Sequence, residues 1–466
     1  MDKIQVLNFR EFYILISMIN GKTVTVDKSI YQDKNSLKQL LSQNNMYDEM
    51  HFNETYEKEL FKTIFISLHT SSQCNMACTY CFKKDRENQD LSFEDSKQFI
   101  DMIIEEYPNA GKYIVDPTGS GEPLLNKKLL YQIGEYCKEL SNELKREVLP
   151  MIVTNGTLLD KTTVQELRDA GILFGVSLDG NKTSNDFYRK DHTGHSVYKK
   201  VIKNIKNIKD RSLMGVAVTL TDKNVDLVKT LKHLIKYFPT VSIKPVRNVD
   251  GKGGINEGNI ERIEAEYSKL FDFLIEETHK GNLQYIAAIL NGDDYFGKFL
   301  LRSILNQKVS TRCDAGIGRF SLAQDGSIYT CPGAIGIEDL KVGSLEGGIS
   351  YKKRDTFYKI LTERSHCKDC FARFVCGGEC MVSSYYTTRR IDEVDAVMCE
   401  LRKHLYKLSL LYEHIISKTS YYKTIYLACI EKINRFDEDL KVTKYLENNP
   451  QISFMDVKFN REKHNI

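Results

Sequence analysis

The chain has 466 residues, more than one hydrophobic core comfortably holds, so two or three domains are expected. Its formal net charge is +3 with lysines spread along the chain, which gives no reason to expect nucleic acid as a partner. The longest early apolar run, Phe12 to Ile19, is too short to cross a bilayer and follows no cleavable export signal, so we expect a cytoplasmic protein outside the membrane.

Residues 1–62 are expected to form a small unit made of a β-hairpin and a helix. Two β-rich runs, Tyr13 to Ile19 and Lys22 to Val26, flank Asn20-Gly21, which is the signal for a two-residue type I′ turn. A short polar helix is predicted from about Ser36 to Gln43. By itself the pattern indicates a cap packed on the next domain, because short appended hairpins are ordinary structure.

Three cysteines follow the first apolar run of the central region at spacings of four and three residues: Cys74, Cys78 and Cys81. Thiolates are the soft anionic ligands that iron-sulfur clusters require, and three ligands on a four-iron cluster leave one iron free to bind another molecule. A zinc site without its fourth ligand and a set of unrelated core thiols are the alternatives. The spacing favours a cluster whose free iron is the reactive one.

From about Thr63 the chain alternates strand-like runs with amphipathic helical stretches, one of which is predicted from about Phe93 to Glu106. The strand-like runs are Ile64 to Leu68, Tyr113 to Val115, Met151 to Val153, Leu173 to Leu178, Met214 to Leu220 and Val241 to Ile243. This alternation predicts a parallel sheet with crossover helices, most simply a partial (β/α) barrel. In such folds the chemistry gathers on the loops at the carboxyl ends of the strands.

Three short motifs stand at those strand ends. Gly119-Ser120-Gly121-Glu122-Pro123 follows the second strand, where glycines let the backbone approach a ligand and a carboxylate can accept hydrogen bonds from an ammonium group. Thr154-Asn155-Gly156-Thr157 and Val176-Ser177-Leu178-Asp179-Gly180 end the next two strands, and each taken singly is also an ordinary turn sequence. Arg189 is a further candidate binding residue, with a surface arginine as the alternative.

The region after the barrel is expected to be a linker and helical bridge over residues 251–312, and it begins in a glycine-rich loop from Arg247 to Asn259. Asp325-Gly326 is predicted to be a hairpin turn that enters a strand. After Cys399 the chain is predicted to be helical to about Leu446.

Seven further cysteines follow this bridge: Cys313, Cys331, Cys367, Cys370, Cys376, Cys380 and Cys399. Their ligand-like spacing without an export signal points to reduced thiols that hold metal, and zinc knuckles are the alternative by ligand type. Cys137 and Cys429 lie in apolar helical stretches, so we expect them to be buried structural thiols.

Between about Thr63 and Tyr412 these motifs resemble radical S-adenosylmethionine (radical SAM) enzymes that carry a SPASM extension. The phrases Glu122-Pro123-Leu124-Leu125-Asn126, Cys313-Asp314-Ala315-Gly316 and Cys370 to Gly378 are most similar to maturases of small cysteine-rich ribosomal peptides, the six-cysteine (SCIFF-type) ranthipeptide and sactipeptide group. The resemblance implies an α/β fold, with a partial (β/α)6-type radical SAM barrel over residues 63–250, a SPASM domain over residues 313–412 and a helical tail over residues 413–466.

The same resemblance implies three [4Fe-4S] clusters and S-adenosylmethionine (SAM) as cofactors. Cys74, Cys78 and Cys81 would hold the SAM-binding cluster, Cys367, Cys370, Cys376 and Cys399 the outer auxiliary cluster, and Cys313, Cys331 and Cys380 the inner one. The implied SAM contacts are Tyr80 at the adenine, Gly119, Gly121 and Glu122 at the amino group, Ser177, and Arg189 at the carboxylate. Neither the pattern nor the resemblance ranks a residue as the general base.

The implied reaction is reductive cleavage of SAM followed by abstraction of hydrogen from a ribosomally made peptide. The inner set has three cysteines, and Arg319 lies near the expected fourth position, so an iron there is open to a substrate thiolate. We therefore expect a thioether crosslink from a cysteine sulfur to a carbon. The expected partners are a small cysteine-rich precursor peptide and a reductant such as flavodoxin or ferredoxin.

Three alternatives remain open. One is a carbon-carbon or carbon-oxygen crosslink. Another is an oxidation like that of sulfatase maturases, although those relatives have a further cysteine near the place of Arg319 and an aspartate where Pro332 follows Cys331 here. The third is a zinc-stapled peptide-binding module without catalysis. Related maturases also bind a leader peptide at an N-terminal strand edge, which makes residues 1–62 a candidate docking element.

Overall fold

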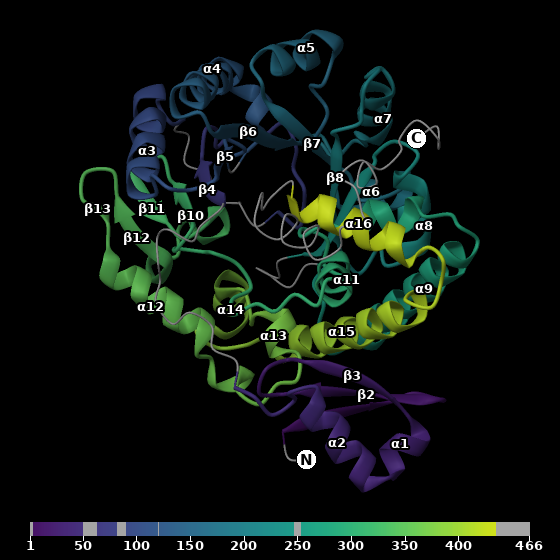
Figure 1. Ribbon diagram of the computed structural model, residues 1–466. Coiled ribbons are helices and arrows are strands. Elements are labelled where there is room, and N and C mark those ends of the chain that lie inside the picture. The colour runs from purple at the N-terminus through teal and green to yellow at the C-terminus, as the bar shows by residue number, and fades with distance from the viewer. Residues whose placement is uncertain (1–2, 50–62, 82–89, 120, 247–252, 435–466) are drawn as a thin grey trace.

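The computed structural model describes residues 3–49, 63–81, 90–119, 121–246 and 253–434 (Figure 1). Its N-terminal unit is a three-stranded antiparallel sheet in the order β1 (Ile4–Asn8), β2 (Phe12–Ser17) and β3 (Thr23–Asp27), followed by α1 (Lys28–Gln32) and α2 (Lys34–Gln43). The hairpin and the polar helix expected from the sequence are present, and β1 is an additional strand.

The turn between β2 and β3 differs from the predicted type I′ turn. It is a longer loop in which the Ser17 N–H donates to the Lys22 carbonyl at 2.9 Å. Gly21 has a φ of 68°, but Asn20 is not among the residues of positive φ, as a type I′ turn requires. The reason is that the buried Asn20 amide donates to the carbonyls of Asn45 and Asp48, both at 2.8 Å, and so ties the loop to the end of α2.

Six parallel strands form the central sheet, and they are neighbours in chain order. They are β4 (Thr63–Leu68), β5 (Lys112–Asp116), β6 (Glu147–Thr154), β7 (Leu173–Ser177), β8 (Gly215–Leu220) and β9 (Thr240–Pro245). The helices between them are α3 (Phe93–Glu106), α4 (Lys127–Leu144), α5 (Lys161–Asp169), α6 (Lys182–Tyr188), α7 (Tyr198–Lys206) and α8 (Leu227–Leu234). Figure 1 shows the curved sheet with these helices around its outside, which confirms the predicted partial barrel.

The two faces of a strand explain this layering. On β4, Ile64, Ile66 and Leu68 are fully buried and pack in one apolar cluster with Phe99 and Ile103 of α3. Helix α3 begins where the Ser92 hydroxyl accepts from the Asp95 N–H at 2.9 Å, a standard N-cap. The sheet therefore turns its apolar face outward to the helices and leaves its other face toward the interior of the barrel.

The cysteine-rich region continues the same sheet. Strand β10 (Arg319–Leu322) pairs in parallel with β4, and β11 (Ser327–Tyr329), β12 (Lys341–Ser344) and β13 (Gly348–Ile349) extend it by antiparallel pairing. The predicted hairpin at Asp325-Gly326 is confirmed, with a φ of 77° at Gly326. Joining both regions in one sheet fixes the auxiliary cysteines relative to the barrel.

The other helices follow β9 in the chain. They are α9 (Ile260–His279), α10 (Gln284–Ile289), α11 (Gly297–Ile304), α12 (Tyr351–Thr362), α13 (Arg373–Cys376), α14 (Met381–Thr388), α15 (Ala396–Ile416) and α16 (Tyr422–Asn434). The predicted helical tail is confirmed as far as α16, and the stretch to Leu446 lies outside the described residues. Among the described residues no helix has the length and apolar character needed to span a membrane.

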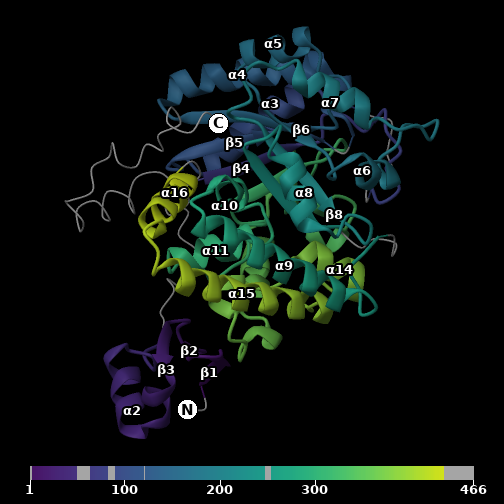
Figure 2. The same ribbon diagram turned by 90° about the vertical axis from the view of Figure 1, so that its right-hand side faces the viewer.

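The N-terminal unit lies next to α15 (Figure 2), and α13 is beside it in Figure 1. The Phe12 and His414 rings lie 4.0 Å apart between centroids, and Lys3 pairs with Asp369 at 2.6 Å. A side chain at Gly21 would place its Cβ 2.6 Å from Cβ of Phe374. The unit therefore sits next to the segment that carries Cys367, Cys370 and Cys376.

Candidate active site

Cys74, Cys78 and Cys81 lie in the loop that follows β4, at the carboxyl edge of the sheet. The Cys78 thiol is within electrostatic range of both other thiols, and burial raises its pKa. The segment after α6 holds this loop, because Ala77 N–H donates to the Lys190 carbonyl at 2.8 Å and Thr79 N–H to the Tyr188 carbonyl at 3.1 Å. The structure thus brings together the three cysteines predicted for the SAM-binding cluster.

Side-chain amides also fix this loop, which we refer to as the cluster loop (residues 72–81). The Asn75 Nδ2 donates to the Thr157 hydroxyl at 2.8 Å, and the Asn75 Oδ1 accepts from the Asn155 Nδ2 at 2.8 Å. The motif after β6 therefore positions the cluster loop. Nothing in the cysteine spacing points to Asn75, so the sequence interpretation missed it.

The two glycines of the motif after β5 are required by protein packing. A Cβ at Gly121 would lie 1.9 Å from the Gln73 carbonyl oxygen, and one at Gly119 would lie 2.9 Å from the Ser71 carbonyl oxygen. The next residue, Glu122, donates its N–H to the Gln73 carbonyl at 2.7 Å. These glycines let the motif lie directly on the cluster loop, and Ser120 between them is outside the described residues.

Glu122 is 1% exposed, and protein groups occupy its carboxylate. It accepts from the Thr154 hydroxyl at 2.6 Å and from the N–H groups of Asn155 and Leu124 at 2.7 and 3.2 Å. Burial raises the pKa of Glu122, and the hydrogen bonds from Thr154 and Asn155 oppose that shift. The carboxylate therefore joins the motifs after β5 and β6, a role that the sequence did not indicate.

Tyr80, Asp179 and Arg189 form a partly buried chain of hydrogen bonds. The Tyr80 hydroxyl donates to Asp179 Oδ2 at 2.6 Å and accepts from Arg189 Nη1 at 2.8 Å. Asp179 Oδ1 accepts from the Thr219 N–H at 2.9 Å, while burial raises the pKa of Asp179 against the opposing effect of Arg189. Arg189 is 7% exposed, so the surface-arginine alternative is wrong. Ser177 ends β7 at the same edge of the sheet.

The four cysteines predicted for the outer set come together from three segments. Cys367 ends the 3-10 turn Ser365–Cys367, and Cys370 follows it three residues later. Cys376 ends α13, and Cys399 lies in the first turn of α15. The Cys367 thiol is within electrostatic range of the other three thiols, and burial raises its pKa to about 11.

The inner set is also assembled at one place. The Cys313 thiol is within electrostatic range of Cys380, and Gly316 N–H donates to the Thr330 carbonyl at 3.2 Å, beside Cys331. Arg319 is within electrostatic range of Cys313, and its guanidinium lies 3.7 Å from the centre of the Phe65 ring. A guanidinium, rather than a thiol, therefore occupies the position near the expected fourth ligand. Cys137 and Cys429, predicted to be structural, are both 0% exposed.

The donor chemistry fits iron-sulfur clusters. In the described part of the chain, no three His, Cys, Asp or Glu side chains converge on the position of a single metal ion. Within the same residues, the buried Arg364 Nε and Nη1 and the Arg402 Nε have no hydrogen-bond acceptor. Both guanidiniums lie among the cysteines of the two auxiliary sets, where the sulfur atoms of a cluster would be acceptors. Neither arginine was found from the sequence, because Arg402 stands beside Lys403 between Leu401 and Leu405 and nothing local distinguishes the two.

Comparison with known proteins gives a family match within the barrel. Residues 68–234 match the model of the Radical SAM superfamily. A cysteine-type anaerobic sulfatase-maturating enzyme of Clostridium novyi (strain NT) is 23% identical over 387 residues, which cover 76% of this chain and 96% of that protein. An uncharacterized protein of Methanocaldococcus jannaschii is 27% identical over 180 residues, which cover 38% of this chain and 59% of that protein.

Two solved structures share the fold. The structure of anSMEcpe with bound AdoMet has a TM-score of 0.60 at 19% identity and covers 77% of this chain and 100% of its own. The structure of Streptococcus suis SuiB bound to the precursor peptide SuiA has a TM-score of 0.50 at 16% identity and covers 85% and 98%. The chain therefore shares the α/β fold of these structures, its residues 68–234 are similar to the Radical SAM superfamily, and its cysteine-rich C-terminal region fits the same architecture.

Proposed function

We propose that this chain, whose residues 68–234 form a radical SAM domain, is a peptide maturase that installs a thioether between a cysteine sulfur and a carbon of its substrate. The thioether is proposed because of the composition of the inner cysteine set. It offers three thiols, and Arg319 stacks on Phe65 near the fourth position. A substrate thiolate is the ligand best matched to an iron left open there, since iron favours soft anionic sulfur.

The clusters and SAM supply the electron transfer and the 5′-deoxyadenosyl radical, and an external reductant such as flavodoxin or ferredoxin supplies the first electron. One hydrogen atom leaves the substrate carbon with the 5′-deoxyadenosyl group, and one proton leaves the thiol. Formation of the carbon-sulfur bond then releases one electron, which a cluster held by the auxiliary cysteines would accept. The peptide loses two hydrogens in total for each crosslink.

The chain's own residues hold this chemistry in place. The cluster loop is fixed on one side by Asn75 and on the other by the backbone of Tyr188 and Lys190. Arg189 binds the SAM carboxylate. Tyr80, whose hydroxyl lies 2.8 Å from Arg189 Nη1, packs on the adenine. Outer cysteines Cys367, Cys370, Cys376 and Cys399 hold one auxiliary cluster, and Cys313, Cys331 and Cys380 hold the other.

Oxidation of a protein side chain, as in sulfatase maturation, is the competing function. It is supported by the sulfatase-maturating relatives, of which the chain covers up to 96%, and by the fold shared with anSMEcpe bound to the Cp18Cys peptide. It is disfavoured by Arg319 and Pro332, which stand where those enzymes have a cysteine and an aspartate. A carbon-carbon or carbon-oxygen crosslink is the remaining alternative.

We assign the N-terminal unit to leader-peptide docking. Among the described residues, β3 pairs only with β2, so its other edge offers backbone groups for an added strand. Because Ser17 N–H donates to Lys22, the alternation of an antiparallel pair turns the N–H groups of Thr23 and Thr25 away from β2. The substrate class that fits this edge is an extended peptide.

Mass spectrometry of a co-produced substrate tests the thioether. The probe is a peptide from a short cysteine-rich reading frame beside the gene, expressed with and without the enzyme and then treated with an alkylating reagent. The proposal predicts a loss of two hydrogens and one unalkylated cysteine for each crosslink. If two hydrogens are lost while every cysteine still alkylates, the carbon-carbon or carbon-oxygen crosslink is correct.

A further inference from the structure

We propose that Arg364 and Arg402 are positioning residues that bind the sulfur atoms of the two auxiliary clusters and raise the reduction potentials of these clusters. This inference rests on the proposed function, because it needs clusters at both auxiliary cysteine sets. The two guanidiniums lie between those sets, and nothing in the cysteine spacing indicates them.

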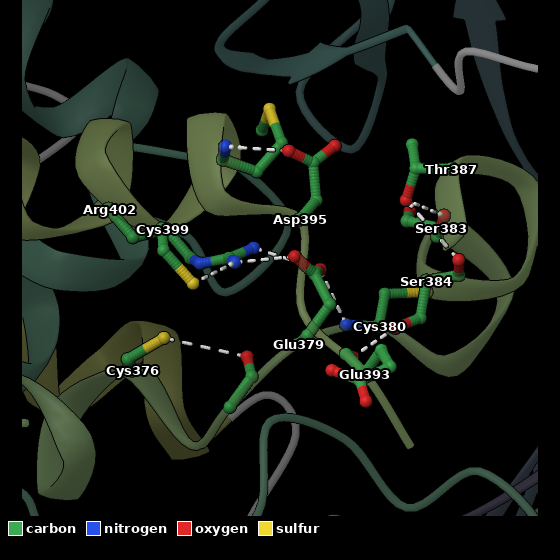
Figure 3. A network of polar contacts seen from close by, with 12 residues as sticks. Cys376, Glu379, Cys380, Ser383, Ser384, Thr387, Glu393, Asp395, Cys399 and Arg402 are labelled. Carbon is green, nitrogen blue, oxygen red and sulfur yellow. Dashed lines mark hydrogen bonds and ion pairs between the residues drawn. The ribbon is translucent and has the colours of Figure 1, made fainter. Parts of the chain in front are cut away.

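Arg402 contacts the outer set directly and the inner set through a carboxylate. Its Nη2 donates to the Cys399 sulfur at 3.3 Å, and its Nη1 donates to Glu379 Oε1 at 2.9 Å. Glu379 Oε1 in turn accepts from the Cys380 N–H at 2.7 Å (Figure 3). One buried side chain thus connects an outer cysteine, through one carboxylate, to the backbone of an inner cysteine.

Arg364 approaches the same region from the segment before Cys367. It is 5% exposed, and its Nη2 donates to the Ile391 carbonyl at 2.9 Å. Its Nε and Nη1 have no acceptor within the described residues, although Cys367, Cys380 and Glu379 are all within electrostatic range. An unpaired buried N–H is costly, so two of them on one guanidinium indicate an acceptor that the protein itself does not supply.

The charges lead to the same conclusion. Arg364 and Arg402 are two buried cations that repel each other, and one buried carboxylate, Glu379, lies between them. A four-iron cluster held by four thiolates carries a net negative charge, and one-electron reduction makes that charge more negative. Buried cations that donate hydrogen bonds to sulfur stabilise the reduced state more than the oxidised state, so they raise the potential.

This arrangement suits an electron acceptor in the proposed reaction. The substrate radical must give up one electron as the carbon-sulfur bond forms, and a higher potential at the neighbouring clusters favours that transfer. Arg402 also links the two sets by one hydrogen-bonded path, so it positions α15 and the Cys376–Cys380 segment relative to each other.

The test is a redox titration followed by EPR spectroscopy, in full-length protein whose Cys74, Cys78 and Cys81 are changed to alanine so that only auxiliary clusters contribute. In this background Arg364→Gln and Arg402→Gln should each lower the auxiliary midpoint potentials. Glu379→Gln removes a negative charge and should raise them. Opposite signs from the two sides of one ion pair are not expected of residues that act only on folding.

Arg390→Gln is the matched control, because Arg390 is a solvent-exposed arginine of the same region and pairs with Asp392 at 2.7 Å. It should leave the potentials unchanged. If Arg402→Gln does not fold, Arg364→Gln decides, because it leaves the Glu379–Arg402 pair intact.

Iron analysis distinguishes a failure of this inference from a failure of the proposed function. Unchanged potentials in protein that retains its auxiliary iron overturn this inference and leave the proposed function standing. A background protein that binds no iron overturns both.

Discussion

The hydroxyl of Tyr80 accepts a hydrogen bond from Arg189 Nη1 at 2.8 Å, although 109 positions separate the two residues in the chain. The contact joins the cluster loop to the end of α6, and Asp179 Oδ2 completes it at 2.6 Å from the same hydroxyl. Two of the residues predicted for SAM binding are therefore held against each other by a protein contact. Side chains that a protein holds in place lose less entropy when a ligand binds.

Arg189→Lys should weaken SAM binding by about tenfold or more. A lysine keeps the charge but loses the planar pair of donors, and hydrogen bonds to charged groups contribute about 1.5–3 kcal/mol. The affinity can be measured by titrating SAM into the reconstituted protein and following the EPR signal of its cluster. Lys190→Met, one residue along, is the control, and equal affinities for Arg189→Lys and the wild type would show that Arg189 does not contact SAM.

Glu122→Gln should destabilise the protein by about 1–3 kcal/mol, because an amide cannot accept from all three donors around this buried carboxylate. Urea unfolding of the protein without cofactors measures this free energy. Glu139→Gln on the exposed face of α4 is the control and should be neutral. No difference between the two variants would mean that Glu122 does not join the motifs after β5 and β6.

Arg319→Cys should abolish thioether formation while the iron content is retained. The new thiolate would stand near the fourth position of the inner set and would compete with the substrate sulfur. Arg319→Ser removes the same guanidinium from Phe65 without adding sulfur, so it controls for the lost stacking. Peptide mass and iron analysis are the two measurements. If both variants form the crosslink equally well, the substrate cysteine does not use this position.

Thr25→Pro should weaken binding of the precursor peptide and leave SAM cleavage intact. Proline removes an N–H that points away from β2, so it blocks an added strand while the β2–β3 pairing is kept. Fluorescence anisotropy of the labelled leader peptide measures the binding, with Thr25→Val as the control. Equal affinities for both variants would place the docking site elsewhere.

Periodicity in the sequence predicts most of the barrel, including α3 at Phe93–Glu106, because local caps and apolar spacing set these elements. Strand β6 is longer than predicted. It begins at Glu147, and it pairs with β5 up to Pro150 and with β7 from Met151 onward. A proline lacks the N–H of a sheet ladder, so it reads as a strand boundary in the sequence, whereas here it marks the change of partner.

The site could be predicted only in part. Cysteine spacing identifies the ligand sets, because a cluster demands soft donors at short separations. Glu122, Asn75, Arg364 and Arg402 depend on contacts between residues far apart in the chain, and no local pattern indicates such contacts. The parallel pairing of β10 with β4 is non-local in the same way, so no local pattern indicates that the two cysteine regions share one sheet.

Release of 5′-deoxyadenosine from SAM tests the central claim most directly. The anaerobically reconstituted protein is reduced with dithionite in the presence of SAM, and the product is quantified by liquid chromatography for the wild type and for variants with Cys74, Cys78 or Cys81 changed to alanine. Our account predicts release by the wild type and none above background by the three variants, while Cys137→Ala retains the activity. Release that survives the loss of these cysteines would contradict the assignment of the radical chemistry to the cluster loop.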